Sequence, residues 1–111
     1  MADIKELVDI CKNVIEDKKG TDIKVLNLEG LSPIADYFIL ANGSNQNQLH
    51  AMSDEILEKL NKAKVNPKHI EGYQAGNWIL MDYGDFMVHL FMPEAREFYN
   101  LDRIWKDAKT E

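Results

Sequence analysis

The stretch NWILMDYGDFMVHLFM, residues 77–92, decides the fold. It consists of two mostly apolar runs, NWILMDY and FMVHLFM, separated by the two residues Gly84 and Asp85. A two-residue loop with glycine first is typical of a type II′ β-hairpin, so we expect Tyr83 to lie opposite Phe86. The sequence therefore predicts two antiparallel strands in a fixed register.

This register sorts the hairpin side chains onto two faces, because successive residues of a strand point to opposite sides. The first set is mostly apolar and is expected in the core: Ile79, Met81, Tyr83, Phe86, Val88 and Leu90. The second set mixes aromatic, apolar and charged side chains: Trp78, Leu80, Asp82, Met87, His89 and Phe91. The register also brings Asp82 within diagonal reach of His89, which predicts a hydrogen-bonded pair.

Patterns on both sides of the hairpin predict further helices and strands. Apolar residues spaced by three and four predict helices, and alternating or continuous apolar runs predict strands. The predicted segments are a helix over 3–18, strands over 23–28 and 36–41, a helix over 49–63 that Asn66-Pro67 ends, a weak strand over 69–74, and short helices over 94–99 and 101–108. The continuous apolar run at 36–41 is typical of a central strand covered on both faces. The order of these segments indicates an α/β fold, a mixed β-sheet with flanking helices, in a single domain over residues 1–111.

The charge of the chain narrows the classes of partner. The 111 residues contain 13 Lys and Arg against 19 Asp and Glu, for a net charge of −6. Phosphate backbones and anionic lipids repel such a protein, so we expect neither sequence-specific nucleic-acid binding nor membrane association. The sequence also shows no signal peptide pattern and no apolar run of about 18 residues. We therefore expect a cytoplasmic protein.

The candidate catalytic and metal-ligating residues are few. His50, His69 and His89 are scattered without cysteine partners, so we expect no metal site and no cofactor. Cys11 lies on the apolar stripe of the first helix, where a structural thiol is expected.

The Gly43-Ser44 turn between a strand and a helix has two interpretations. It resembles the phosphate-binding turn of nucleotidyltransferases, but the strand with two alternating carboxylates is missing. Asp54 and Glu55 instead fall within the predicted helix. We favour a helix N-cap and no enzymatic activity, with a minimal nucleotidyltransferase-like, nucleotide-binding enzyme as the alternative.

The distribution of charge points to a docking surface. No Lys or Arg occurs between Lys24 and Lys59 or between Lys68 and Arg96, although both stretches contain acids. One explanation is that buried strands exclude lysine. The other is that aromatic and apolar anchors rimmed by Asp82, Asp85 and Glu94 bind a basic protein, as complementary charge favours. Two rival interpretations stay open: Ile104 and Trp105 cover this face, or the face pairs with itself in a homodimer.

Several motifs together resemble one protein family. They are Ile34-Ala35-Asp36-Tyr37-Phe38, Asn42-Gly43-Ser44, Glu71-Gly72, Trp78 to Tyr83 with Gly84-Asp85, Val88-His89, Pro93-Glu94-Ala95-Arg96 and Leu101 to Trp105. Over nearly the whole chain they resemble the ribosomal silencing factor family, RsfS or Iojap-like. The resemblance implies a nucleotidyltransferase-like fold without the catalytic carboxylates.

The resemblance also implies a function. Members of the family bind large-subunit ribosomal protein fourteen (uL-fourteen) on the free large subunit, block association with the small subunit, and so repress translation when nutrients are limiting. Carried onto this sequence, the resemblance implies a partner-binding surface in the hairpin region. Its expected members are Trp78 and Met87 as apolar anchors, Asp82, Asp85 and Glu94 facing Lys or Arg, and Tyr83 and His89 as hydrogen-bonding groups.

Overall fold

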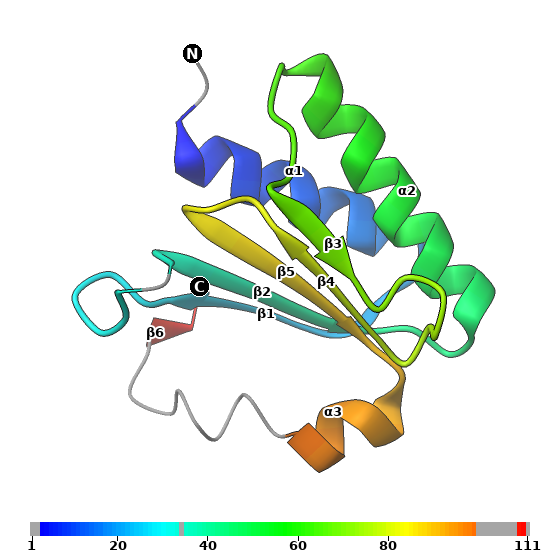
Figure 1. The fold of residues 1–111 in the computed structure, drawn as a ribbon. Coiled ribbons are helices and arrows are strands. Elements are labelled where there is room, and N and C mark those ends of the chain that lie inside the picture. Colours follow the sequence, from blue (N-terminus) through cyan, green and yellow to red (C-terminus); the bar gives the residue numbers. More distant parts are fainter. Residues whose placement is uncertain (1–2, 34, 100–108, 111) are drawn as a thin grey trace.

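The fold was established as a computed structural model that describes residues 3–33, 35–99 and 109–110. Within these described residues, three helices and six strands follow one another (Figure 1). They are α1 (Ile4–Asp17), β1 (Thr21–Asn27), β2 (Tyr37–Asn42), α2 (Gln46–Lys62), β3 (His69–Glu71), β4 (Trp78–Asp82), β5 (Phe86–Phe91), α3 (Pro93–Tyr99) and β6 (Lys109–Thr110). None of the helices in these described ranges has the length and apolar content to cross a membrane.

The strands form one mixed sheet in the order β3-β4-β5-β2-β1-β6. β2 and β5 pair in parallel, and every other neighbouring pair is antiparallel. Every residue of β2 is buried, as expected for a strand with cover on both faces. The predicted α/β class, the mixed sheet and the central position of this strand are confirmed.

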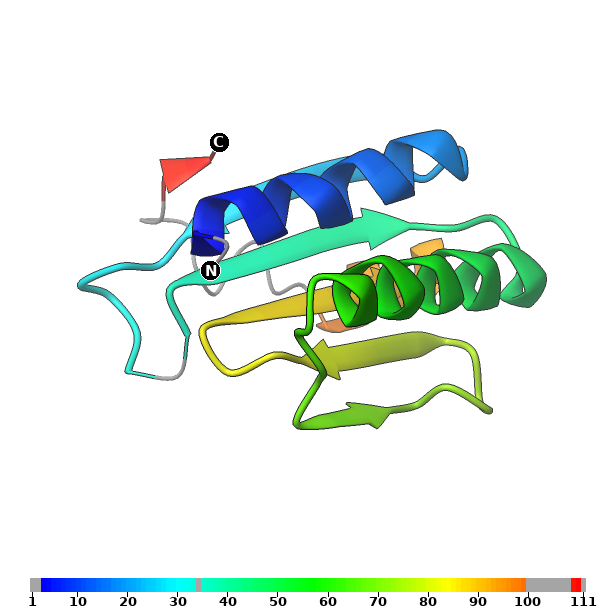
Figure 2. The same ribbon diagram turned by 90° about the horizontal axis from the view of Figure 1, so that it is seen from above.

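Helices α1 and α2 lie side by side on one face of the sheet, and α3 lies on the other side, next to the end of β5 (Figure 2). Capping side chains fix where the two long helices begin. Asp3 accepts a hydrogen bond from the Lys5 amide, and Asn45 Oδ1 accepts one from the Gln48 amide at 2.8 Å. The apolar stripes of both helices pack on the sheet and form the main core with the first set of hairpin side chains.

The hairpin has the predicted register. The Tyr83 amide donates to the Phe86 carbonyl at 3.0 Å, and Asp82 pairs with Met87. Gly84 has a φ of +88°, the left-handed value that a type II′ turn needs at its first central position. The first set of hairpin side chains is buried throughout, so this face was predicted correctly.

Several predicted boundaries differ from the structure; α2, for example, begins at Gln46 and not at residue 49, because Asn45 caps it. β1 begins at Thr21, before the predicted start at residue 23, because Thr21 pairs with Asn42 across an irregularity in the register. α2 ends at Lys62, before Asn66-Pro67, because Lys64 adopts a left-handed φ of +64° and the Val65 amide returns to the Leu60 carbonyl. The predicted weak strand exists but stops at Glu71, since Gly72 has a φ of +77°. The predicted helix over 101–108, with Ile104 and Trp105, lies outside the described residues.

Candidate docking face

The register of the sheet assembles its second face, opposite α1 and α2, from rows of paired residues. One row runs from β3 to β2 through Glu71, Leu80, His89 and Leu40. The neighbouring row consists of His69, Asp82, Met87 and Phe38, and Trp78 pairs with Phe91 beside them. The second set of hairpin side chains therefore shares this face with residues of β2 and β3.

Exposure along these rows rises from the centre of the sheet toward β3. Four residues over β2 and β5 are buried: Phe38, Leu40, His89 and Phe91. The residues of β3 and β4, together with Met87 of β5, are exposed or partly exposed: His69, Glu71, Trp78, Leu80, Asp82 and Met87. We call these six residues the edge patch. It combines two carboxylates and a histidine with three apolar side chains.

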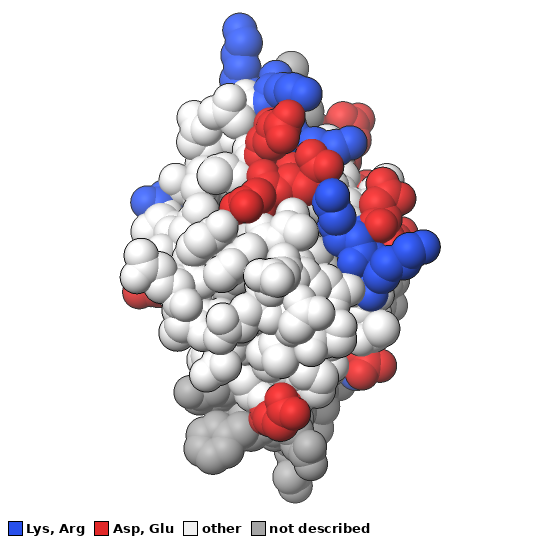
Figure 3. Space-filling model, turned by 90° about the vertical axis from the view of Figure 1, so that its right-hand side faces the viewer, with Lys and Arg blue, Asp and Glu red and all other residues white. Residues whose placement is uncertain are grey.

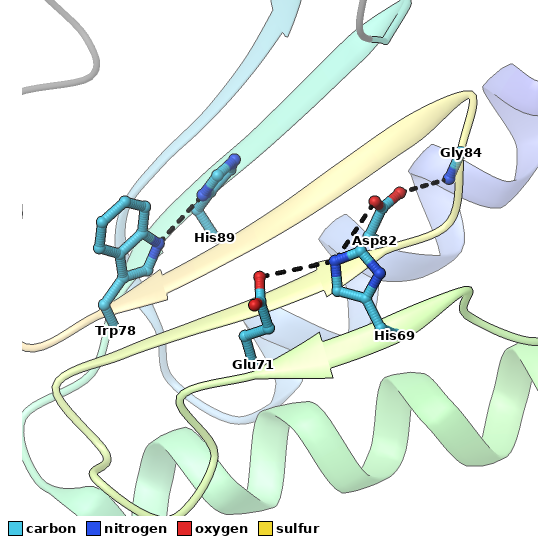
Figure 4. A network of polar contacts seen from close by, with 6 residues as sticks. All are labelled: His69, Glu71, Trp78, Asp82, Gly84 and His89. Carbon is cyan, nitrogen blue, oxygen red and sulfur yellow. Dashed lines mark hydrogen bonds and ion pairs between the residues drawn. The ribbon is translucent and has the colours of Figure 1, made fainter.

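Trp78 is held in place from behind by buried rings. Its indole nitrogen donates to Nδ1 of His89 at 3.0 Å (Figure 4), and its ring stacks on Phe91 at 5.3 Å between centroids. Since an indole N–H only donates, Nδ1 of His89 accepts and the proton of the neutral imidazole is on Nε2. His89 thus orients Trp78, and we infer that it does not reach a partner itself.

Burial also fixes the charge state of His89. Only 4% of the residue is exposed, and desolvation lowers its pKa to about 4. Nε2 has no hydrogen-bond partner among the residues that the structure describes. His89 is therefore neutral at physiological pH, and the charge of this face comes from the edge patch.

Asp82 bonds to the hairpin turn and to β3. Its Oδ1 accepts from the Gly84 amide at 2.8 Å, and its Oδ2 lies 3.6 Å from Nε2 of His69 (Figure 4). The same His69 nitrogen lies 3.5 Å from Glu71 Oε2. The predicted pair between Asp82 and His89 is wrong, because Nδ1 of His89 accepts from Trp78 and Asp82 bonds to the hairpin amide and to His69 instead.

The structure separates the seven predicted partner-binding residues into groups. Trp78, Asp82 and Met87 lie together on the edge patch. Asp85, in the hairpin turn, and Glu94, in the first turn of α3, are exposed but lie at opposite ends of β5. Asp85 therefore shares the hairpin end with Asp82, whereas Glu94 lies at the other end of β5, so the three carboxylates do not form one rim.

Tyr83 and His89 do not have the surface position that the sequence-based assignment requires. Tyr83 belongs to the first set of hairpin side chains and packs in the core under α1, where burial raises the pKa of its hydroxyl. His89 is buried on the second face. Both assignments as hydrogen-bonding groups for a partner are therefore corrected: the alternation of side chains buries the first residue, and the β2–β5 pairing buries the second.

Sequence reasoning missed three members of the edge patch: His69, Glu71 and Leu80. The alternation of His69, Ile70 and Glu71 placed both polar residues on one face of the weak strand. The local pattern does not predict that β3 pairs with β4 in antiparallel orientation. This pairing sets Glu71 opposite Leu80 and His69 opposite Asp82.

The side of the molecule next to this face has a broad uncharged area (Figure 3). Residues 43–53 and 72–77 contain no Asp, Glu, Lys or Arg, and they form the turn before α2, the first half of α2 and the β3–β4 loop. Figure 3 shows this side as a broad uncharged area below a band of mixed charges. It offers a basic partner no electrostatic attraction, unlike the edge patch.

The Gly43-Ser44 turn uses its polar groups within the fold. The Ser44 amide and hydroxyl both bond to Gln48 Oε1, at 2.6 and 2.9 Å, and Gln48 Nε2 donates to the carbonyls of Lys18 and Lys19. This arrangement joins the start of α2 to the end of α1, as expected for a helix N-terminus. Within the described ranges, no group of three or more His, Cys, Asp or Glu residues is placed to hold a metal ion.

Cys11 is the buried structural thiol that its position predicted. It lies in the core under α1, and desolvation raises its pKa to about 12. Such a thiol is protonated and unreactive at physiological pH.

Comparisons with known proteins agree with the fold. A family model described as "Ribosomal silencing factor during starvation" matches residues 1–111. The protein named ribosomal silencing factor RsfS from Halalkalibacterium halodurans is 36% identical over 106 residues, which cover 96% of this chain and 91% of that protein. A mouse protein named "Mitochondrial assembly of ribosomal large subunit protein 1" is 31% identical over 88% of this chain and 44% of its own length.

The fold is also similar to that of a solved structure. The crystal structure of a Chromobacterium violaceum protein superimposes with a TM-score of 0.91 at 31% sequence identity, covering 95% of this chain and 88% of that chain. The match in sequence and the match in fold both extend over nearly the whole chain. The chain therefore belongs to the ribosomal silencing factor family, RsfS.

Proposed function

We propose that this protein represses translation by binding the large ribosomal subunit through ribosomal protein uL-fourteen and blocking association with the small subunit. Its family membership supports a role as a silencing factor, and the name of the mouse relative refers to the large subunit. The mechanism is steric occlusion. It needs a stable surface that a basic ribosomal protein recognises, and neither turnover nor a cofactor.

The edge patch is the observation that carries this proposal. Trp78, Leu80 and Met87 offer apolar contact area, and Trp78 is held in its orientation before any partner arrives. Asp82 and Glu71 supply negative charge beside them. Truncating a central aromatic anchor typically costs about 2 kcal/mol or more of binding energy, whereas a charge at the rim mainly affects the association rate.

A subunit-association experiment tests the proposal. Separated ribosomal subunits are mixed with a saturating amount of the protein and resolved on a sucrose gradient. We expect wild-type protein to migrate with the free large subunit and to reduce the amount of associated ribosomes. Trp78→Ala combined with Asp82→Asn should abolish both effects, and the asparagine retains an oxygen that can accept from the Gly84 amide.

A double variant on α2 provides a matched control. Leu57→Ala with Glu58→Gln also removes one partly exposed apolar side chain and one carboxylate, but on the helix that packs on the opposite face of the sheet. It should behave as wild type. Undiminished ribosome association in the presence of saturating wild-type protein would disprove the proposed function.

A further inference from the structure

A pocket opens at the outer end of the edge patch, between β3 and β4. Glu71, Gly72, Trp78 and Leu80 line it, and its volume is about 270 Å³. We propose that this pocket receives one arginine or lysine side chain of the basic protein that the edge patch binds. The inference rests on the proposed function and assigns to Glu71 the recognition of that side chain.

The walls of the pocket are fixed by the fold. Gly72 has a φ of +77°, and a Cβ there would lie 2.1 Å from the carbonyl oxygen of Trp78, so the two backbones approach as only glycine allows. Beyond Gly72, His50 Nε2 donates to the Tyr73 carbonyl at 2.6 Å, and the Tyr73 hydroxyl donates to Asp54 at 2.9 Å. These bonds hold the β3–β4 loop against α2, so the pocket exists before a ligand enters.

The lining matches the chemistry of a basic side chain. The indole of Trp78 and the side chain of Leu80 suit the aliphatic stem, and an aromatic ring also attracts a cation over its face. The Glu71 side chain is 66% exposed, so its carboxylate can meet the charged end of an incoming side chain.

The charges around the pocket leave the Glu71 carboxylate available to a cationic side chain. Nε2 of His69 lies 3.5 Å from the Glu71 carboxylate and 3.6 Å from the Asp82 carboxylate. Within the described part of the chain, no Lys or Arg forms an ion pair with either carboxylate. An arginine or lysine of the partner would bring a permanent positive charge to these carboxylates. Charge complementarity therefore favours a cationic side chain over an acidic or neutral one.

The first experiment tests the pocket without the ribosome. Acetyl-arginine amide is titrated into the protein while the NMR signals of the Trp78 indole N–H and the Gly72 amide are followed, and a Trp105→Phe variant identifies the Trp78 signal. Acetyl-citrulline amide, which has the same shape without the charge, serves as the control ligand. We expect arginine to shift both signals saturably and citrulline to shift them at least three times less. Equal shifts with both ligands would overturn the inference.

The second experiment measures affinity for the large subunit with Glu71→Gln. The control is Glu58→Gln, because the Glu58 side chain is 62% exposed and also forms one ion pair, with Lys62 at 3.4 Å. At low salt we expect Glu71→Gln to weaken binding about three- to tenfold, and Glu58→Gln to leave it unchanged. Equal affinities of wild type and Glu71→Gln would refute the pocket assignment. Failure of wild-type protein to bind the subunit would instead refute the proposed function, and the arginine titration would still decide what the pocket binds.

Discussion

Protonation of His89 should make the protein sensitive to acid. The pKa of this residue is about 4 in the folded protein, against an ordinary value of 6.5, because burial penalises the charged form. The unfolded chain therefore binds a proton more readily than the folded one. The neutral imidazole imposes no penalty above about pH 6.5, and stability is lost as the pH falls from there toward 4.

The loss in free energy of unfolding follows from the size of the pKa shift of His89. A difference of about 2.5 units, at about 1.36 kcal/mol per unit, approaches 3 kcal/mol at pH 4 and is about half of that at pH 5.5. A loss of this size is a substantial fraction of the stability of an ordinary small domain. Protonation also removes the acceptor that Trp78 uses, since Nδ1 of the imidazolium becomes a donor.

Urea unfolding at pH 7, 5.5 and 4 measures this effect, with His89→Leu as the reference. The leucine fits among Leu40, Leu80 and Phe38, which surround the ring, and does not titrate. Because all other ionisable groups are common to both proteins, the difference between their free energies of unfolding isolates His89. Between pH 7 and pH 4 we expect the wild-type protein to lose about 3 kcal/mol more free energy of unfolding than His89→Leu. Parallel pH profiles of the two proteins would refute the reasoning.

Two further predictions concern the core and the pocket wall. Cys11 should resist alkylation by iodoacetamide in the native protein and react completely in urea, because its thiol is buried and its pKa is about 12. Alkylation of the native protein as fast as that of the unfolded protein would contradict this prediction. Gly72→Ala should lower the free energy of unfolding by about 1 to 2 kcal/mol for the left-handed backbone and by about another 1 to 3 kcal/mol for the contact with the Trp78 carbonyl. The control is Gly30→Ala, where φ is +80° but open space surrounds the new Cβ, so only the backbone cost should apply. If both variants lost the same free energy of unfolding in thermal or urea denaturation, the close approach at Gly72 would be disproved.

Local chemistry explains which parts of the fold could be predicted from the sequence. The hairpin register depends on Gly84, whose left-handed φ and place in a two-residue loop set Tyr83 opposite Phe86. Once the register is known, alternation decides which side chains are core, and all six of that set are buried. The start of β1 depended on pairing between distant segments, since Thr21 joins this strand by pairing with Asn42.

The candidate site was less predictable because exposure depends on strand order. Sequence alone did not show that β5 would pair with β2, and this pairing surrounds His89 with Leu40 and Phe38 and takes it out of the surface. Nor did it show that β3 would pair with β4, which adds Glu71 beside Trp78. The sequence therefore indicated the right face, while the topology determined which of its residues a partner can reach.

The row from Leu40 through His89 and Leu80 to Glu71 explains how one face serves both stability and docking. Its inner end is apolar and neutral, and burying a charge there would cost folding energy, as the depressed pKa of His89 indicates. Its outer end carries an exposed carboxylate, which water solvates at little cost. The hydrogen bond from Trp78 to His89 connects the two ends, because the rigid interior fixes the orientation of the aromatic anchor. Negative charge can thus be concentrated at the β3–β4 edge, where it attracts a basic partner, without weakening the core behind it.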